Sequence, residues 1–522
     1  AAGAGAGRGG AGAGGRRGAA GAARAAGKEK GGAGQKGGGG GKKGGDAGGA
    51  VAARSEDFGR WYLDVIREAD LCDYGPVRGT MVIKPYGYAL WEEVQGWLDR
   101  RFKELGHKNA YFPQFIPYSF IEKEASHVEG FSPELALVTK GGGKDLEDPL
   151  VVRPTSETIV NHMFSQWVQS HRDLPLLINQ WANVTRWEMR TRPFVRTLEF
   201  LWQEGHTAHA SQAEAEAETL QMIRVYEEFA RDQAAMPVVA GRKSRLESFA
   251  GADYTFTIEG MMGDRKALQA GTSHYLGQNF ARAFETQFQT EGGELEHVYQ
   301  TSWGVSTRMV GGVIMTHGDD KGLTLPPRLA PVQVVVVPIY KKDEEKASVL
   351  AAAEGALAAC QAAGIRTELD ASEGKSPGWK YNYWEQRGVP VRIEIGPRDV
   401  AKNACVAARR DVPGKEGKEF GVPLEAGALT AHLEGLLEDI QQGMLRRAVE
   451  FRDANIVDVA SYDELKEAIA AGKGKAAEGD GGKGNPSPKA RPTREAAGGR
   501  DTPVCFDFQK GHCTRGDACK FL

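Results

Sequence analysis

The sequence has 522 residues, of which 41% are hydrophobic and 26% charged, with a formal net charge of −3. These values are ordinary for a globular protein and exclude a wholly disordered or fibrous chain. No apolar run approaches the roughly 18 residues that a transmembrane helix needs, and the length predicts about three domains.

The first fifty residues differ from the rest. They hold 23 of the 69 glycines and nine Lys or Arg against two Asp or Glu, so they carry +7, whereas the other 472 residues carry −10. Since they contain no aromatic residue, we expect residues 1–53 to be a disordered basic leader. The acid-poor composition suits an organellar targeting segment, and a flexible basic linker is the alternative.

Residues 54–328 mix helical and strand patterns. Helical spacing predicts a helix over 86–105, and a capping box of Ser211 and Glu214 begins another that runs to about 235. Short apolar strands are predicted at 150–153, 198–202 and 311–315. This mixture predicts an α+β domain.

After Pro326 and Pro327 the pattern becomes an alternation of strands and helices. A continuous β-branched run at 332–338 predicts a strand buried on both faces, and a helix follows at 344–363. Two more strands, at 365–369 and 391–395, complete a compact α/β domain over 331–440. The remaining predicted segments are helices within 441–472, a Gly- and Pro-rich linker at 473–503 and a tail at 504–522.

Two oxygen-bearing side chains and an acid follow the first predicted strand, in the segment Arg153-Pro154-Thr155-Ser156-Glu157-Thr158. Thr155 or Ser156 could simply cap the next helix. Their position at a strand end with Glu157 also suits a binding site.

The segment 184–209 interleaves arginines with glutamates, histidines and aromatic residues. In an antiparallel hairpin Arg186 and Glu188 would face the same side, as a solvated ion pair or as part of a site. The surrounding aromatic residues favour a site, because arginine on an apolar surface suits bidentate recognition of phosphate or carboxylate.

Two further segments place polar groups beside glycines. His274 ends the segment AGTSH before a helix predicted from Gln278, and alone it would more often be a packed histidine. Arg308 precedes a Gly-Gly pair in an apolar stretch, and a buried arginine there needs an anionic partner.

Together these segments resemble the class II aminoacyl-tRNA synthetases, and most of all the archaeal/eukaryotic type of prolyl-tRNA synthetase in its plant and algal organellar forms. Residues 106–117 resemble motif 1, RWE with its following arginines motif 2, and GVSTRMVGG motif 3. RPTSET, FLWQEGHTAH and AGTSH resemble elements specific to the prolyl enzymes. The resemblance covers residues 55–470.

The resemblance implies an antiparallel six- to seven-stranded class II sheet in a catalytic domain at 54–328, followed by an α/β anticodon-binding domain. It implies a homodimer through motif 1. Fewer than a hundred residues separate His209 from Thr301, so we expect no cis editing insertion.

The resemblance also implies residue roles. The catalytic residues would be Arg186, Glu188 and Arg308. The residues that bind proline would be Thr155, Glu157, Arg186, Phe200, Trp202 and His274. ATP would contact Arg186, Glu188, Arg196, Thr197, Gln269, Thr272 and Arg308, with Mg²⁺ sharing the charge of its phosphates. The anticodon would contact Lys380, Glu385, Arg387 and Arg398, although the family more often has lysine where Arg387 stands.

The C-terminal region departs from the family. The usual small domain after residue 472 is replaced by the linker, and the tail has Cys505, Cys513 and Cys519 at the spacing of a CCCH zinc finger. The histidine that would complete the finger, four residues after Cys519, is not present in this sequence. We therefore expect either an incomplete Zn²⁺ site or three unliganded thiols.

The predicted function is a proline–tRNA ligase that forms prolyl-adenylate from L-proline and ATP and then charges tRNA(Pro), in the chloroplast or mitochondrion, with the cytoplasm as the alternative. Two other functions stay open. One is a synthetase-derived RNA-binding protein without catalysis, and the other is a class II synthetase for another amino acid.

Overall fold

The computed structural model describes residues 51–123 and 135–471. The leader, the 473–503 linker and the cysteine-bearing tail therefore lie outside the described residues. Within the described ranges no helix is long and apolar enough to cross a membrane.

The first elements of the described chain contribute to the largest hydrophobic core. Helix α1 (Phe58–Glu68) is followed by the two-stranded β1 (Cys72–Tyr74) and β2 (Met81–Ile83) and by α2 (Pro85–Glu104). α2 confirms the helix predicted at 86–105, and it begins with Pro85 because a helix's first turn does not need that N–H. Its buried face packs into the largest hydrophobic core.

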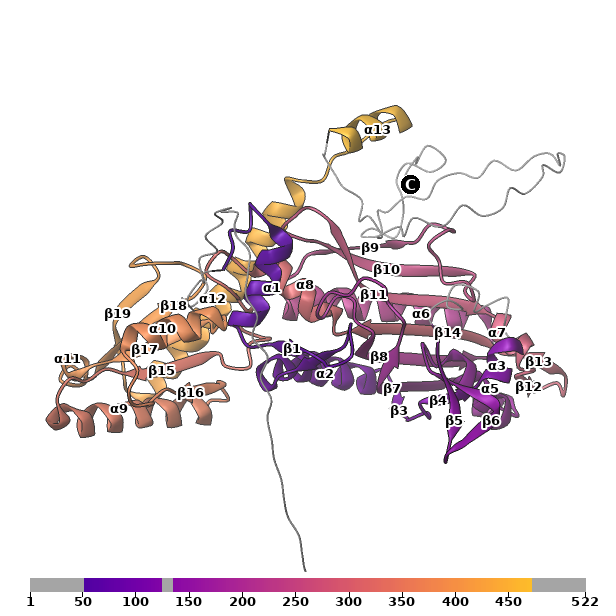
Figure 1. The fold of residues 1–522 in the computed structure, drawn as a ribbon, viewed down its shortest axis with the longest axis horizontal. Coiled ribbons are helices and arrows are strands. Elements are labelled where there is room, and N and C mark those ends of the chain that lie inside the picture. Colours follow the sequence, from indigo (N-terminus) through magenta and orange to yellow (C-terminus); the bar gives the residue numbers. More distant parts are fainter. Residues whose placement is uncertain (1–50, 124–134, 472–522) are drawn as a thin grey trace, which may run out of the picture. The chain divides into compact units, whose positions relative to one another are not determined.

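A seven-stranded sheet forms the centre of the described fold (Figure 1). Its pairs are antiparallel except for β3 beside β7. In spatial order the strands are β3 (Lys108–Asn109), β7 (Leu176–Thr185), β8 (Glu199–His209), β14 (Tyr299–Ser306), β11 (Ala267–Gly277), β10 (Tyr254–Met261) and β9 (Val238–Arg242).

Helix α6 (Gln212–Glu228) packs against β8, β10, β11 and β14. Ser211 and Glu214 form the predicted capping box, and the helix continues as the π-helix η3 (Phe229–Gln233), which confirms the prediction to about residue 235. Helix α8 (Arg308–His317) follows β14 directly.

The strand predicted at 311–315 is wrong, because these residues lie inside α8. Five apolar residues cannot distinguish a buried strand from a buried helix by periodicity. Here the run is the middle of a ten-residue helix whose residues Met309–Met315 are all buried.

A smaller three-stranded sheet and its helices surround the turn that carries Thr155. β4 (Phe115–Pro117) and β5 (Ala136–Gly141) both pair with β6 (Lys144–Val152), which contains most of the predicted 150–153 strand. The nearby elements are α3 (Tyr118–Lys123), α5 (Glu157–Trp167), η2 (His171–Asp173), α7 (Asn279–Ala283), β12 (Gln287–Gln289) and β13 (Leu295–His297).

The stretch between β8 and β14 is fully described and holds no separate domain. It consists of α6, η3, β9 to β11, α7 and the short hairpin of β12 and β13. The expectation of no inserted editing domain therefore agrees with the described residues.

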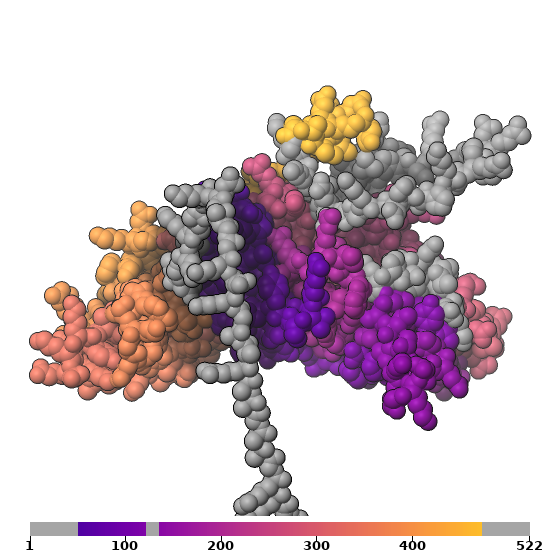
Figure 2. Space-filling model, in the orientation of Figure 1, coloured from indigo at the N-terminus to yellow at the C-terminus, as the bar shows by residue number. Residues whose placement is uncertain are grey.

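The C-terminal elements build a mixed five-stranded sheet in the order β16 (Thr367–Leu369), β15 (Val334–Pro338), β17 (Val391–Ile395), β18 (Ala404–Arg409) and β19 (Lys418–Pro423). β15 is parallel to both of its neighbours and buried throughout, as its β-branched run predicts. Figure 2 shows the orange residues of this sheet and its helices gathered in one continuous surface.

Five helices of the described residues alternate with these strands or follow them in the chain, and α9 confirms the helix predicted at 344–363. The helices predicted within 441–472 correspond to the end of the long α12 and to α13. The helices are α9 (Asp343–Ala362), α10 (Pro377–Gln386), α11 (Pro397–Val400), α12 (Ala426–Asp453) and α13 (Tyr462–Ala470).

Candidate active site

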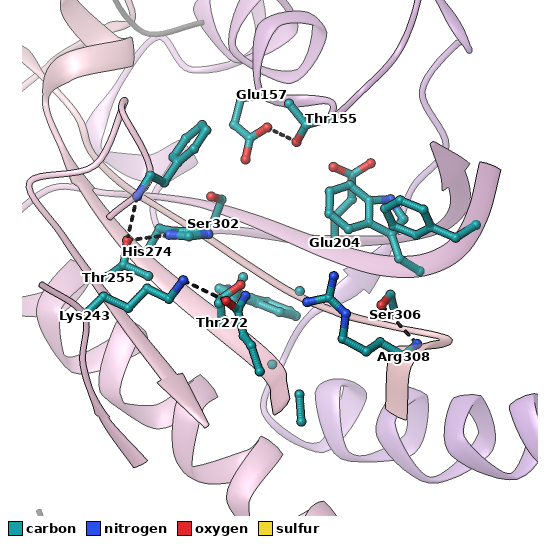
Figure 3. A pocket seen from close by; sticks show the side chains of 18 of the residues that line it. Thr155, Glu157, Glu204, Lys243, Thr255, Thr272, His274, Ser302, Ser306 and Arg308 are labelled. Atoms are coloured by element: carbon teal, nitrogen blue, oxygen red, sulfur yellow. Dashed lines mark hydrogen bonds between the residues drawn. The ribbon is translucent and has the colours of Figure 1, made fainter. Parts of the chain in front are cut away.

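A cavity of about 330 Å³ opens on the main sheet between β8, β11, β14 and the turn before α5 (Figure 3). Nine of the twelve active-site residues predicted from the sequence line it. These are Thr155, Glu157, Arg186, Phe200, Trp202, Gln269, Thr272, His274 and Arg308. Residues that lie up to about 150 positions apart in the chain thus share one cavity.

Thr155 and Glu157 form one end of the cavity (Figure 3). Both side chains are buried, and the Thr155 hydroxyl donates a hydrogen bond to the Glu157 carboxylate. Ser156 between them occupies the N-cap position of α5 but makes no side-chain cap bond, because its hydroxyl donates to Glu204. The alternative that Thr155 or Ser156 simply caps the helix is therefore wrong.

Arg186 lies across the aromatic wall of the cavity. Its guanidinium carbon is 5.4 Å from the ring centres of both Phe200 and Trp202, and its Nε donates to the Pro154 carbonyl at 3.0 Å. These contacts fix the plane of the guanidinium, which suits the recognition of a planar carboxylate or a phosphate.

The hairpin predicted around Arg186 and Glu188 is only partly correct. β7 and β8 pair in antiparallel register up to Thr185 and Glu199, and both residues lie in the long connection beyond the ladder. The Glu188 carboxylate lies 3.6 Å from the Arg196 guanidinium. Glu188 and Arg196 do not line the cavity. Thr197, whose hydroxyl donates to the Glu199 carbonyl, does not line it either.

Arg308 begins α8 and projects into the cavity from the side opposite Thr155 (Figure 3). Its Nε donates to the Val195 carbonyl at 3.0 Å. Burial, with the nearby positive charges of Arg196 and Arg186, lowers the pKa of Arg308 to about 10. A guanidinium destabilised in this way gains from an anionic ligand.

β11 supplies the opposite wall with His274, Thr272 and Gln269. The His274 Nδ1 lies 2.8 Å from the Thr255 hydroxyl, and burial together with the charge of Lys243 lowers the pKa of His274 to about 3. The imidazole is therefore neutral at physiological pH and serves as a polar, uncharged wall.

Sequence reasoning missed three charged residues of the cavity, Lys243, Glu247 and Glu204. Lys243 follows β9 in a polar stretch that looks like a surface turn, and its Nζ donates to the Gln269 side-chain oxygen at 2.7 Å. No sequence signal distinguishes it. Glu204 could have been found, because alternation along β8 puts it on the same face as Phe200 and Trp202.

The residues predicted for anticodon binding lie on and beside α10 and α11. Lys380 is buried, and its ammonium donates to the Asp370 carbonyl at 2.7 Å. Arg387 stacks on Tyr383 at 3.7 Å and lies 3.5 Å from the Asp70 carboxylate. Glu385 pairs with Arg392 at 3.0 Å, and Arg398 is exposed.

The predicted zinc ligands Cys505, Cys513 and Cys519 lie outside the described residues. Within the described ranges no group of three His, Cys, Asp or Glu side chains is placed to hold a metal ion. The three described cysteines are buried free thiols.

Known protein families and relatives are similar to this chain over most of its described residues. The family description "tRNA synthetase class II core domain (G, H, P, S and T)" matches residues 138–317, and "Anticodon binding domain" matches 333–426. The chain is 69% identical to the chloroplastic/mitochondrial proline–tRNA ligase of Arabidopsis thaliana, over 81% of this chain and 78% of the relative. It is 56% identical to the proline–tRNA ligase of Chlorobium luteolum, over 81% and 86%.

A solved structure is also similar. It is the crystal structure of the prolyl-tRNA synthetase of Cryptosporidium parvum complexed with halofuginone and AMPPNP. The two chains superpose with a TM-score of 0.77 and 41% sequence identity, over 81% of this chain and 86% of the other.

Proposed function

The chain belongs to the proline–tRNA ligases, a family of class II aminoacyl-tRNA synthetases, and from this premise we propose how its own residues perform the reaction. The enzyme joins proline to tRNA at the expense of ATP. The observation that carries our proposal is the single cavity that gathers Thr155, Glu157, Arg186 and Arg308.

The ammonium of proline binds between Glu157 and the Thr155 hydroxyl. A secondary ammonium has two N–H donors, which a carboxylate and a neutral oxygen can both accept. The pyrrolidine ring then lies against Phe200, Trp202 and His274. His274 suits this place because its low pKa keeps it from adding a positive charge beside the ammonium.

Activation is an attack by the proline carboxylate oxygen on the α-phosphorus of ATP, which breaks the bond to pyrophosphate and forms prolyl-adenylate. Since both reactants are anionic, positioning and charge stabilisation dominate over general base catalysis. Arg186 bridges the carboxylate and the α-phosphate. Arg308 and Arg196 hold the terminal phosphates.

The remaining ATP contacts come from Glu188, Thr197, Gln269 and Thr272. Mg²⁺ fits as part of the nucleotide substrate, since Mg²⁺ is commonly bound through substrate phosphates rather than by an all-protein cage. When bound, the ion shares the negative charge of the phosphates.

Four further assignments complete the proposal. The catalytic domain spans 54–328 and the anticodon-binding domain 331–440, with 441–472 as the helical start of a C-terminal region. Glu385 and Arg398 are the accessible candidates for anticodon contacts, whereas Lys380 and Arg387 hold α10 in place. The enzyme acts as a homodimer. It works in the chloroplast or mitochondrion, which is supported by the named location of the Arabidopsis relative.

The test is ATP–pyrophosphate exchange by the full chain with proline, alanine, cysteine, threonine or glycine. We expect exchange with proline far above the others and a loss of at least about 100-fold in Arg186→Ala, because one preorganised transition-state contact is worth that much. Equal exchange in the variant would refute the role of Arg186. No exchange from the folded wild type would favour an RNA-binding protein without catalysis.

A further inference from the structure

A closed ring of hydrogen bonds lies directly behind the Thr155–Glu157 pair. The Ser156 hydroxyl donates to Glu204 Oε1 at 2.5 Å, and the Gln180 amide nitrogen donates to Glu204 Oε1 at 2.6 Å and to the Ser156 hydroxyl at 2.9 Å. All three side chains are buried. Ser156 stands between Thr155 and Glu157 in the sequence, so the ring holds the peptide that carries both.

Glu204 has no acceptor position left for a ligand. Its Oε1 accepts from Ser156 and Gln180, and its Oε2 accepts from the Ser156 backbone N–H at 3.1 Å and faces the His206 Nε2 at 3.2 Å. An ionised carboxylate offers about four lone-pair directions, two on each oxygen. Glu204 lines the cavity (Figure 3), but its carboxylate oxygens are thus all engaged by groups of the protein.

Gln180 is committed in the same way. Its side-chain oxygen accepts the Phe112 backbone N–H at 2.9 Å, while its amide nitrogen serves Ser156 and Glu204. The ring therefore joins β7, β8, the segment before β4 and the start of α5. These elements meet only by tertiary folding, so the ring fixes the turn relative to the main sheet.

Charge strengthens the arrangement. Burial by itself raises the pKa of Glu204, but the hydrogen bond and charge of His206, together with the bonds from Ser156 and Gln180, bring it below its ordinary value. For His206 the directions are reversed. Burial by itself lowers its pKa, but the hydrogen bond and charge of Glu204 raise it above its ordinary value. Each group thus stabilises the charged form of the other. Breaking the hydrogen bonds of the ring would therefore leave buried polar groups without partners, at a large cost in free energy.

We propose that Glu204 is a positioning residue for proline recognition, which holds Thr155 and Glu157 at the spacing that the substrate ammonium requires. The inference rests on the proposed role of Thr155 and Glu157. It adds a residue that acts through Ser156 and touches neither substrate. Its loss should therefore weaken proline binding and leave the ATP end of the cavity intact.

The test compares Glu204→Gln with Glu218→Gln in ATP–pyrophosphate exchange by the full chain. Glu218 is a matched control, because it is also buried and pairs with a histidine, His107, at 2.8 Å, but it does not line the cavity. We expect Glu204→Gln to raise the KM for proline by about tenfold or more, with the KM for ATP within about twofold, since small displacements of positioning groups cost this much. Glu218→Gln should leave the KM for proline unchanged. Equal effects of the two variants on the KM for proline would overturn the proposal.

Ser156→Ala keeps the test decisive if Glu204→Gln does not fold. It removes the bridging hydroxyl and retains the backbone N–H bond to Glu204, so the KM for proline should rise with little change in kcat. Glu157→Gln separates this inference from the proposed function. If Glu157→Gln raises the KM for proline and neither Ser156→Ala nor Glu204→Gln does, the positioning role is wrong. If Glu157→Gln itself has no effect, the ammonium site is wrong.

Discussion

Basic side chains in the cavity are held in an environment that favours an anionic ligand. Burial lowers the pKa values of both Arg308 and Lys243, and the positive charges of neighbouring residues lower that of Arg308 further. Arg308 remains protonated near neutral pH, because its pKa of about 10 lies well above 7. The protein thus accepts an unfavourable concentration of positive charge, which a polyphosphate would relieve.

His317 predicts a pH dependence of stability. Its Nε2 lies 2.9 Å from the Ala234 carbonyl, and burial, reinforced by the charge of Arg447, lowers its pKa to about 4 from an unfolded value of 6.5. Between these values the unfolded chain binds more protons than the folded one. The contribution of His317 to the free energy of unfolding therefore falls as the pH drops from about 6.5 to about 4.

We expect His317→Gln to lose less stability than the wild type on acidification, because a neutral amide can still donate to Ala234 but does not titrate. Urea unfolding at about pH 7, 6 and 5 measures the difference. Parallel losses in the two proteins would show that His317 is not protonated on unfolding in this range. All other titrating groups are common to both proteins and cancel in the comparison.

Helix α8 belongs both to the hydrophobic core and to the candidate active site. Its first residue is Arg308, and its glycines Gly311 and Gly312 let it approach the neighbouring segments closely. A Cβ on Gly311 would lie 2.9 Å from Val195 Cγ2 and 3.0 Å from the Tyr62 hydroxyl. Val195 also supplies the carbonyl that holds Arg308, so the packing of this helix and the position of its arginine depend on each other.

The two glycines provide a matched pair of substitutions. Gly311→Ala should lower the free energy of unfolding by about 1–3 kcal/mol through overpacking, and it should raise the KM for ATP by displacing Val195 and Arg308. A Cβ on Gly312 would lie 3.3 Å from the sulfur of Met236. Since methionine adapts readily and alanine gains about 1 kcal/mol of helix propensity over glycine, Gly312→Ala should change stability by less than about 1 kcal/mol.

Chemical denaturation and ATP titrations of exchange measure both effects. A Gly311→Ala enzyme with wild-type stability and KM for ATP would contradict the close packing seen here. Gly312→Ala is the control, because both substitutions change helix propensity by the same amount. The difference in stability between the two variants therefore measures the steric effect at Gly311 alone.

Elements whose physical cause is local could be predicted from the sequence. α2 and α6 follow from helical periodicity, and α6 also from its capping box. β15 follows from its β-branched run. The strand at 311–315 failed because its five apolar residues fit two buried structures equally well. Its helical state depends on the turn at Arg308 and on packing against distant residues.

The same distinction applies to the site. Motif residues such as Thr155, Arg186 and Arg308 were identified because each lies in a short segment with an unusual pattern, and the fold brings them into one cavity. Lys243 was missed because its place in the cavity depends on β9 lying beside β10 and on a contact with Gln269, a residue 26 positions away. Only the tertiary structure determines such a neighbour.

At the scale of the whole molecule, Arg410 connects the end of α8 with α10, which are distant in the sequence. Its two terminal nitrogens each donate at 2.7 Å to the Asp319 carboxylate, just beyond α8, and its Nε donates to the Glu385 carbonyl in α10 at 2.9 Å. The Arg410 side chain is 3% exposed and Asp319 is 46% exposed. Burial alone would raise the pKa of Asp319, but Arg410 keeps it below its ordinary value, which shows a favourable interaction.

We expect Arg410→Ala to separate the two steps of the reaction. Asp319 can be solvated when its partner is removed, so the loss of stability should stay at about 1–3 kcal/mol. The cavity on the main sheet is untouched, so ATP–pyrophosphate exchange should stay within about twofold. Charging of tRNA should fall by about tenfold, a usual size for a coupling between sites, because α10 loses its fixed position relative to α8.

Arg409→Ala is the control for this substitution. Arg409 is adjacent in β18, and its ion pairs, with Asp411 and Asp439 at 2.7 Å, both stay within the C-terminal elements. It should lower stability and leave the ratio of charging to exchange unchanged. If Arg410→Ala and Arg409→Ala reduce charging equally, or if Arg410→Ala reduces exchange as much as charging, the bridge between Asp319 and α10 serves stability alone. A selective loss in Arg410→Ala would instead show that transfer to tRNA depends on holding α10 against the end of α8.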